Sequence, residues 1–194
     1  MSVHGSGNAK LAGYFTIGGI IIVIAFLYEI EGWDFLTRNI SFARETRKAF
    51  INEDGVPSDR SFKVASVTDS QTITVMIDDV EESIRLIGIN TDECYTKQSK
   101  AYLTKIAHSE EVYLETDRLQ GTRDTYGRIL AYAYLQDGQM VNRKMLAGGF
   151  SYEYTYMNSY KYQKEFRNVQ NIAKASERGQ WSLNACNGKV LLQN

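Results

Sequence analysis

Proline, cysteine and histidine are all scarce in this chain of 194 residues. Pro57 is the only proline, the two cysteines are Cys94 and Cys186, and the two histidines are His4 and His108. A chain with so little proline is expected to lie mostly in regular elements. Two cysteines allow at most one disulfide, and because no spacing motif links them we expect two unpaired thiols. Neither histidine is near a cysteine in the sequence, which disfavours a structural zinc site.

An excess of charge of either sign is also missing. The chain has 22 Lys plus Arg and 23 Asp plus Glu, and therefore a formal net charge of −1. Nucleic-acid binding depends on neutralising phosphates, so this balance gives no global electrostatic case for it, and we expect such binding to be weak or absent. The length fits one domain with an accessory segment. The hydrophobic share of 43% favours a folded chain over a disordered one.

A long uncharged run is the strongest local signal in the sequence. Residues 11–28, LAGYFTIGGIIIVIAFLY, contain no Asp, Glu, Lys or Arg. At about 1.5 Å per residue the run spans ~27 Å, close to the ~30 Å core of a bilayer. A cleaved signal peptide usually has a shorter apolar region that ends in small residues, whereas this run ends in LYEIEGW. We therefore predict one transmembrane helix over residues 11–30 after a tail at 1–10, with the lipid bilayer in contact with Leu11, Ile20, Ile24, Tyr28 and Trp33.

Basic residues on the two sides of this run predict its orientation. Lys10 is the only basic residue before it, whereas Arg38, Arg44, Arg47 and Lys48 follow it. The positive-inside rule then places the rest of the chain on the cytoplasmic or matrix side. Residues 31–60 are predicted to form a juxtamembrane helix and a linker. Analogy with small accessory subunits of respiratory complexes suggests the mitochondrial inner membrane, although no cleavable presequence is visible before the run.

Residues 61–185 show the pattern of one mainly β (α+β) domain, followed by a tail at 186–194. Alternating or β-branched segments predict strands at 62–67, 72–77, 83–89, 110–116 and 129–135. Three- and four-residue spacing of apolar side chains predicts helices at 97–108, 141–149 and 160–175. In the last of them Phe166, Val169, Ile172 and Ala173 are expected to face inward. Five strands with an inserted helix and trailing helices are typical of an OB-fold barrel with accessory helices.

Several short motifs follow one another in this domain. They are VTDSQT, RLIGINTDE, DTYGRILAYAY, DGQMVN and RGQW. Their order and spacing over about residues 62–182 resemble the staphylococcal nuclease (thermonuclease) family. The resemblance implies calcium-dependent cleavage of DNA and RNA, in which aspartates hold the metal, two arginines clamp the phosphate and a glutamate acts on the attacking water.

The resemblance places the family's functional residues on this sequence with two important changes. The two arginines correspond to Arg85 and Arg128, and the glutamate corresponds to Glu93. Gln71 and Asn90 stand where the family has metal-binding aspartates. Calcium affinity depends on charged oxygen ligands, so the site is expected to be degenerate and to hold no cofactor, with Ca²⁺ as the alternative.

Other residues at this site have both a functional and a structural interpretation. Asp69 is a candidate residual metal ligand, displaced from the family position. Arg85 and Glu93 could form an internal ion pair that persists as architecture. Tyr152, Tyr154 and Tyr156 lie roughly where the family has tyrosines near its base pocket. Tyr154 and Tyr156 join Arg85 and Arg128 as candidate phosphate or ligand contacts, although alternating aromatic residues on a strand are also typical of packing.

Three functions of different classes follow from these patterns. The first is a non-catalytic, membrane-anchored accessory or scaffolding subunit that has other subunits of a membrane complex as partners. The second is an active membrane-bound calcium-dependent endonuclease. The third is a binding module for phosphate, nucleic acid or lipid headgroups. The replacement of both aspartates speaks against the second function and favours the first.

Overall fold

A computed structural model describes residues 60–188. The predicted membrane anchor at 11–30 and the predicted juxtamembrane segment up to residue 59 lie outside the described residues. Among residues 60–188, no helix has both the length and the apolar character that crossing a bilayer requires. The prediction of a transmembrane helix therefore stays a prediction.

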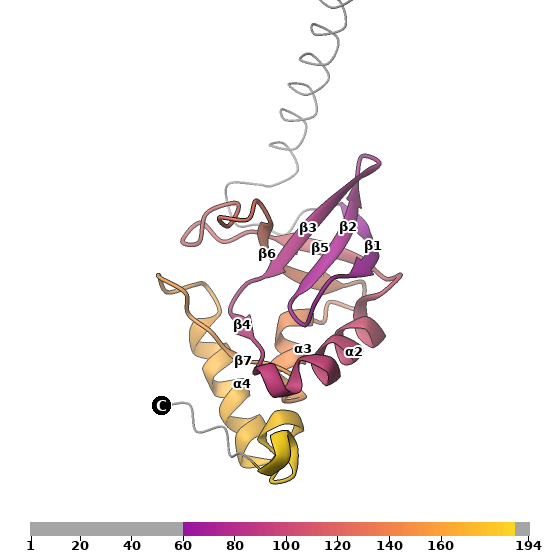
Figure 1. Cartoon of the computed structure of the whole chain (residues 1–194). Coiled ribbons are helices and arrows are strands. Elements are labelled where there is room, and N and C mark those ends of the chain that lie inside the picture. The colour runs from indigo at the N-terminus through magenta and orange to yellow at the C-terminus, as the bar shows by residue number, and fades with distance from the viewer. Residues whose placement is uncertain (1–59, 189–194) are drawn as a thin grey trace, which may run out of the picture. The chain divides into compact units, whose positions relative to one another are not determined.

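Five strands close into a barrel, as Figure 1 shows. They are β1 (Ser61–Val67), β2 (Thr72–Ile77), β3 (Val80–Leu86), β5 (Glu111–Glu115) and β6 (Ile129–Leu135). Their order around the barrel is β1-β2-β3-β6-β5, and β5 pairs with β1 to close it. β3 and β6 run parallel, and the other neighbours are antiparallel. The five-stranded, OB-like barrel predicted from the sequence is confirmed.

The β2–β3 hairpin explains one difference from the predicted strand boundaries. Asp78 and Asp79 both have positive φ, at 48° and 62°, which is the backbone of a two-residue hairpin turn. Ile77 therefore pairs directly with Val80, and β3 begins at Val80 instead of Ser83. The sequence segment DDVEE is consequently shared between a tight turn and a strand.

Helices cover one end of the barrel, below it in Figure 1. α2 (Thr96–Ala107) lies between β3 and β5 in the chain, and α3 (Val141–Ala147) and α4 (Gln163–Ala175) follow β6. Phe166 and Val169 of α4 are buried as predicted, but Ile172 is 52% exposed, so its predicted inward position is wrong. Ala173, four residues after Val169, is buried as predicted.

Short elements connect the barrel to the helices. β4 (Ile89–Asn90) pairs with β7 (Tyr152–Glu153) in a two-stranded sheet. The described part of the chain also contains three short 3₁₀ helices: η1 (Glu93–Tyr95), η2 (Gly179–Trp181) and η3 (Ala185–Gly188). Cys94 in η1 and Cys186 in η3 form a disulfide, with a Cα–Cα distance of 5.4 Å. The prediction of two unpaired thiols is therefore wrong, because the fold brings together two cysteines that are 92 residues apart.

Candidate functional site

Arg85, at the end of β3, is held by main-chain carbonyls. Its two terminal nitrogens donate hydrogen bonds to the carbonyl oxygens of Leu86, at 2.7 Å, and Ile89, at 2.8 Å. Burial, and then the like charge of Arg128, lower the pKa of Arg85 to about 10, although Asp69, Asp124 and Tyr154 act in the opposite direction. The guanidinium thus stays charged at neutral pH in a fixed orientation.

Arg128 is held by a carboxylate on the turn that precedes β6. Its Nε donates to Asp124 Oδ2 at 2.7 Å, and its backbone N–H donates to Asp124 Oδ1 at 3.0 Å. Burial alone would raise the pKa of Asp124, but the hydrogen bonds from Arg128 and Tyr126 outweigh it and lower that pKa below its ordinary value. Arg128 Nη1 lies 3.3 Å from Thr72 Oγ1 on β2. Two strands and one turn therefore bring Arg128 close to Arg85, as the resemblance implied.

The side chains of the turn between β1 and β2 do not form the set of charged oxygen ligands that a calcium site needs. Asp69 Oδ1 accepts a hydrogen bond from the backbone N–H of Gln71 at 2.8 Å, so this carboxylate stabilises its own turn. Gln71 Oε1 is buried and has no hydrogen-bond partner. Its main-chain carbonyl accepts from Leu86 N–H at 2.9 Å, which places the Gln71 backbone beside the end of β3.

Asn90 is engaged in hydrogen bonds within the domain. Its Oδ1 accepts from the backbone N–H of Thr91 at 2.9 Å, and its Nδ2 donates to the hydroxyl of Tyr152 at 3.0 Å. The Asn90 side chain thus donates a hydrogen bond to strand β7, whereas an ionised aspartate at this position could only accept one. Tyr152, one of the three tyrosines that the resemblance places near a base pocket, is thus a hydrogen-bond partner of Asn90.

Glu93 lies on η1, which follows β4 in the chain. Its side chain is exposed, and within residues 60–188 no ion pair joins it to Arg85. The predicted internal ion pair between Arg85 and Glu93 is therefore not formed among the described residues; the Arg85 guanidinium donates to main-chain carbonyls instead. The charges of Arg128, Asp69, Asp124 and Tyr154 all act on the Arg85 guanidinium.

These residues are a poor fit for a hard divalent cation. Ca²⁺ takes six to eight oxygen ligands, several of them charged. Gln71 and Asn90 supply neutral carbonyls, and the nearby carboxylate of Asp69 already accepts a backbone hydrogen bond. Among the described residues, the one close group of three metal-ligating side chains is Asp92, Cys94 and Cys186, whose two sulfurs form the disulfide. No chemical step through a metal follows from this arrangement.

The predicted tyrosines form a row that runs from packed to exposed. The rings of Tyr152 and Tyr154 lie 6.3 Å apart, and those of Tyr154 and Tyr156 lie 6.4 Å apart. The backbone N–H of Tyr154 donates to the carbonyl of Gly88 at 3.0 Å, which fixes the row beside the strand that carries Arg85. Tyr126 contacts the other arginine, with the Arg128 guanidinium 5.3 Å from its ring centre.

A second polar cluster was not foreseen from the sequence. The fully buried carboxylate of Glu115 accepts hydrogen bonds from the hydroxyls of Tyr134 and Tyr162 and from Lys161 Nζ. Burial, and then the hydrogen bond to Glu115, raise the pKa of Tyr134, and the Glu115 hydrogen bond raises the pKa of Lys161. Strand alternation would place Glu115 opposite Leu114, on the outer face of β5. The segment that enters α4 covers that face, which no local pattern could reveal.

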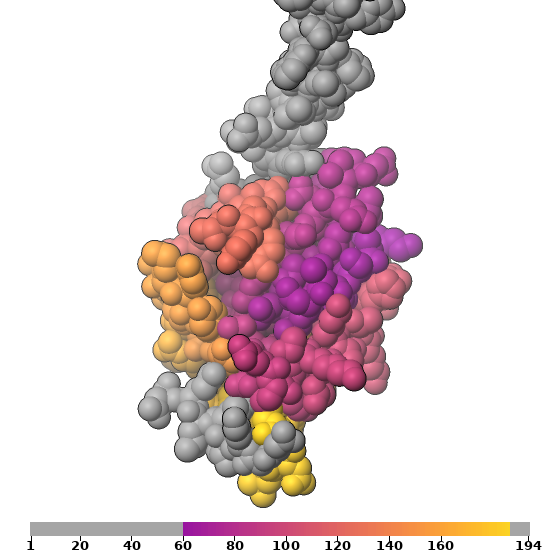
Figure 2. All heavy atoms as spheres, viewed as in Figure 1, coloured from indigo at the N-terminus to yellow at the C-terminus, as the bar shows by residue number. Residues whose placement is uncertain are grey.

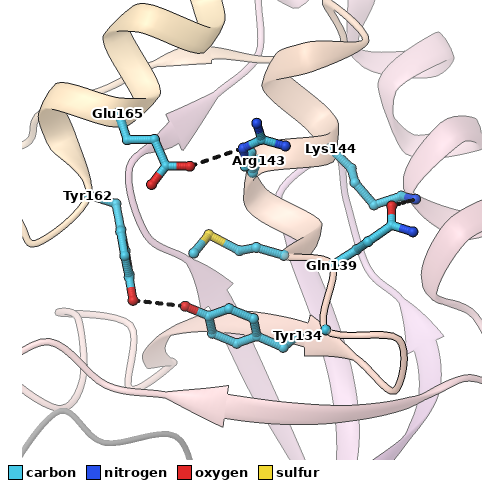
Figure 3. Close-up of a pocket in the computed structure, with 8 residues that line it drawn as sticks. Tyr134, Gln139, Arg143, Lys144, Tyr162 and Glu165 are labelled. Carbon is cyan, nitrogen blue, oxygen red and sulfur yellow. Dashed lines mark hydrogen bonds and ion pairs between the residues drawn. The ribbon is translucent and has the colours of Figure 1, made fainter.

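A cavity of about 430 Å³ lies beside this cluster, between β6, α3 and α4. Figure 3 shows the hydroxyls of Tyr134 and Tyr162 joined on one side of it and Arg143 paired with Glu165 on another. Its cationic side chains already have partners, since Lys144 donates to Gln139. The cavity is therefore separate from the arginine site, and the charged groups that line it are already paired.

The closed barrel with its accessory helices defines a class of protein, the five-stranded OB-like barrels. Comparison with known proteins makes this specific. The family model of the staphylococcal nuclease homologues matches residues 75–183, more than half of the chain. The chain therefore belongs to the staphylococcal nuclease homologue family.

Individual relatives agree with this assignment. The chain is 27% identical to the thermonuclease of Staphylococcus hyicus over 179 residues, which cover 88% of this chain and 96% of that protein. It is 32% identical to the thermonuclease of Staphylococcus intermedius over 130 residues, 62% of this chain and 76% of that protein. It is also 29% identical to the endonuclease YncB of Bacillus subtilis over 124 residues, 59% of this chain and 58% of that protein.

Proposed function

We propose that this chain uses the nuclease fold to bind a phosphate group between Arg85 and Arg128, and that it does not hydrolyse phosphodiesters with calcium. The observation that carries the proposal is the contrast between the two halves of the site. Both arginines are present and rigidly held, by carbonyls and by Asp124. Both aspartates that would complete a metal site are replaced, by Gln71 and Asn90. Guanidinium groups bind phosphate without a metal.

The arginines have hydrogens left for a ligand. Each terminal nitrogen of a guanidinium carries two hydrogens, and Arg85 uses one from each for the carbonyls of Leu86 and Ile89. Arg128 uses Nε for Asp124, which leaves Nη2 available within the described contacts. Because hydrogen bonds to neighbouring residues fix the guanidinium groups of Arg85 and Arg128, little side-chain entropy is lost when a phosphate binds.

Titration of the full-length chain with dimethyl phosphate in EDTA, followed by phosphorus NMR, tests this binding. We expect line broadening with the unchanged protein and its loss in Arg128→Gln. The matched control is Arg143→Gln, because Arg143 is an exposed arginine in an ion pair on α3, away from the site. Binding that requires added Ca²⁺, or that is unchanged in Arg128→Gln, would contradict the proposal.

We further propose that the domain serves as a membrane-anchored accessory or scaffolding subunit of a membrane complex. The support is the uncharged run at 11–28, together with a site that has kept its phosphate clamp and lost its metal ligands. Carbonate extraction should leave the full chain in the membrane pellet. Native electrophoresis of a mild detergent extract should show it in a larger complex; release by carbonate, or migration as a lone monomer, would count against this role.

An active endonuclease is the second candidate. It is favoured by the presence of Arg85, Arg128 and Glu93 at the family's functional positions and by relatives named thermonuclease and endonuclease. The neutral side chains of Gln71 and Asn90, which stand where the family has metal-binding aspartates, argue against it. A calcium-dependent cleavage assay separates the two candidates.

A further inference from the structure

A carboxylate lies directly beside the disulfide. Asp92 Oδ1 is 2.9 Å from Cys94 Sγ, and it accepts a hydrogen bond from the backbone N–H of Cys94 at 3.1 Å. This carboxylate and the sulfurs of Cys94 and Cys186 all lie within 4.8 Å of one another. Figure 2 shows the C-terminal 3₁₀ segments, in yellow, at the same end of the domain as the magenta segment that begins α2. Three groups of the kinds that bind metals are therefore gathered in one place.

Backbone hydrogen bonds hold both cysteines in place independently of the disulfide. On the η1 side, Tyr95 N–H donates to the Asp92 carbonyl at 2.9 Å. On the η3 side, Ser182 N–H donates to the Gly179 carbonyl at 3.2 Å, and Ala185 N–H donates to the Ser182 carbonyl at 2.9 Å. Reduction of the disulfide removes none of these contacts. We therefore expect the two cysteines to stay close together after reduction.

Reduction turns the three groups into a set of metal ligands. A cellular dithiol supplies two electrons and two protons, which convert the disulfide into two thiols while the dithiol itself becomes a disulfide. A divalent cation can then replace the two thiol protons, because the thiolate is the form of cysteine that binds metals. Two thiolates with one carboxylate favour Zn²⁺ over Ca²⁺ and Mg²⁺, which prefer ligands made entirely of oxygen.

The distances suit a tetrahedral ion. With Zn–S bonds of ~2.3 Å and a Zn–O bond of ~2.0 Å, the ligand atoms lie roughly 3.5–3.8 Å apart. The carboxylate is already within 4.8 Å of both sulfurs, and the Cα atoms of the two cysteines are 5.4 Å apart. Rotation of the cysteine side chains can therefore separate the sulfurs without moving the backbone. Because Cys94 is exposed, water can take the fourth position.

We propose that the reduced chain binds one Zn²⁺ through Cys94, Cys186 and Asp92, and that the ion then joins η1 to η3 in place of the disulfide. The histidine positions alone disfavour zinc, but the third ligand is a carboxylate two residues before Cys94. The link between η1 and η3 is thus available in both kinds of compartment, as a disulfide where it is oxidising and as zinc where it is reducing. The zinc site does not depend on phosphate binding by Arg85 and Arg128.

Titration of the full-length chain with Co²⁺ in detergent tests this site. Co²⁺ is a coloured substitute for Zn²⁺, and its bonds to thiolate give charge-transfer absorption. The reductant is a phosphine, so that no added thiol competes for the metal. We expect one bound Co²⁺ per chain with this absorption after reduction, and no such absorption from the oxidised chain. Added Zn²⁺ should remove the absorption, because it binds the same ligands more tightly.

A conservative change of the carboxylate tests its role as a ligand. Asp92→Asn retains both cysteines and a side-chain acceptor for the Cys94 N–H, but it removes the charged ligand. It should weaken Zn²⁺ binding at least about tenfold, a loss that is typical even of groups that only support a ligand. The matched control is Asp137→Asn, because Asp137 Oδ1 also accepts a backbone N–H two residues later, from Gln139 at 2.9 Å. The control should bind Zn²⁺ like the unchanged chain.

Three results would overturn the zinc site. One is a reduced chain without thiolate charge-transfer absorption, whether circular dichroism shows it folded or unfolded, since the backbone contacts are expected to hold the cysteines together. Another is Zn²⁺ binding that Asp92→Asn leaves unchanged. The third is one metal ion for every two chains, which would place the ligands on different molecules. Phosphate binding in the dimethyl phosphate titration is unaffected by any of these results.

Discussion

At the scale of single residues, this chain has arginines at both of the family's arginine positions and neutral side chains where the family has two metal-binding aspartates. Asn90 is the amide counterpart of aspartate and Gln71 is one methylene longer, and together they remove two negative charges from β4 and from the turn after β1. The Asn90 amide donates to the Tyr152 hydroxyl and accepts from the backbone N–H of Thr91, whereas Gln71 Oε1 is buried without a hydrogen-bond partner. A buried oxygen without a hydrogen-bond partner costs ~1–3 kcal/mol, so glutamine is not the most stabilising side chain at position 71.

The double change Gln71→Asp with Asn90→Asp should raise Ca²⁺ affinity by at least about tenfold, because it restores two charged oxygen ligands. Without calcium the variant should be less stable by ~1–3 kcal/mol, since a buried carboxylate then lacks a partner. Calorimetric titration and thermal unfolding with and without Ca²⁺ measure both effects. The control is Asn168→Asp with Asn171→Asp, two exposed positions on α4. A similar gain in calcium affinity in the control would show that added charge alone is responsible.

Asp124 gives a pH-dependent prediction. Its pKa in the folded state lies below the ordinary value, so its stabilising effect is present above about pH 4 and is lost as the pH falls through the folded-state pKa. Asp124→Asn should therefore lower the free energy of unfolding by ~1–2 kcal/mol at pH 7 and by much less near pH 2. Denaturant unfolding across this range is the measurement. Asp137→Asn changes an exposed turn aspartate and serves as the control; a pH-independent effect of Asp124→Asn would refute the assignment.

At the scale of elements, the C-terminal 3₁₀ segments depend on a close approach between two backbones. Gly149, after α3, has φ of +69°, and a Cβ there would clash with the Arg178 carbonyl. The Gln180 N–H donates to the Gly149 carbonyl at 2.8 Å, which seats η2 against this turn. Gly149 is therefore needed both for its backbone conformation and for the space that it leaves.

Gly149→Ala should destabilise the domain by more than about 2 kcal/mol, because η2 must move away. Gly138→Ala is a matched control, since Gly138 has a similar φ of +79° but no neighbouring atom lies within 4 Å of the place that a Cβ would take. Gly138→Ala should therefore lower the free energy of unfolding by only ~1 kcal/mol, through backbone strain. Thermal unfolding of both variants separates the strain from the clash. Equal losses would show that the close approach contributes nothing.

Elements that follow local rules were predictable from the sequence, and those that depend on tertiary contacts were not. Alternating β-branched residues located β1, β2 and β6 within a residue or so, and apolar spacing located α2 and α3. The start of β3 at Val80 was missed because two aspartates adopt positive φ, which is unusual for residues other than glycine. The Cys94–Cys186 pairing and the burial of Glu115 arise from contacts between distant segments, which no local pattern encodes.

The candidate site was predictable as far as the motifs extend. Arg85 and Arg128 lie together because β3 and β6 are parallel neighbours, and the motif order implied this arrangement. The hydrogen bonds of Arg85 were not predictable, since the Leu86 and Ile89 carbonyls reach its guanidinium only in the folded chain. Charged side chains meet or separate according to the backbone acceptors around them.

At the scale of the whole molecule, the disulfide bears on where the domain works. Disulfides persist in oxidising compartments, whereas the positive-inside prediction places the domain on the reducing side of a membrane. The bond joins η1, next to Glu93, to the C-terminal η3. It links cysteines 92 residues apart and, by the chain-entropy model, stabilises the domain by up to ~4–5 kcal/mol.

Protein isolated from its native membrane with thiols blocked should carry no blocked cysteine before reduction and two after it, as measured by intact mass. Cys94→Ser with Cys186→Ser should then lower the unfolding temperature, because the unfolded chain gains freedom. Two blocked cysteines before reduction would instead support the cytoplasmic or matrix side. A thermal unfolding curve that does not change on reduction would show that the bond adds no stability.

The central claim is that this member of the nuclease family keeps the phosphate clamp without calcium-dependent hydrolysis. The most direct test is cleavage of single-stranded DNA by the unmodified full-length protein, with Ca²⁺ and with EDTA, beside the Glu93→Gln variant. We predict no calcium-dependent cleavage and no difference between the two proteins, because Gln71 and Asn90 supply no charge for the metal. Calcium-dependent cleavage that Glu93→Gln abolishes would contradict the claim and identify the chain as an active endonuclease.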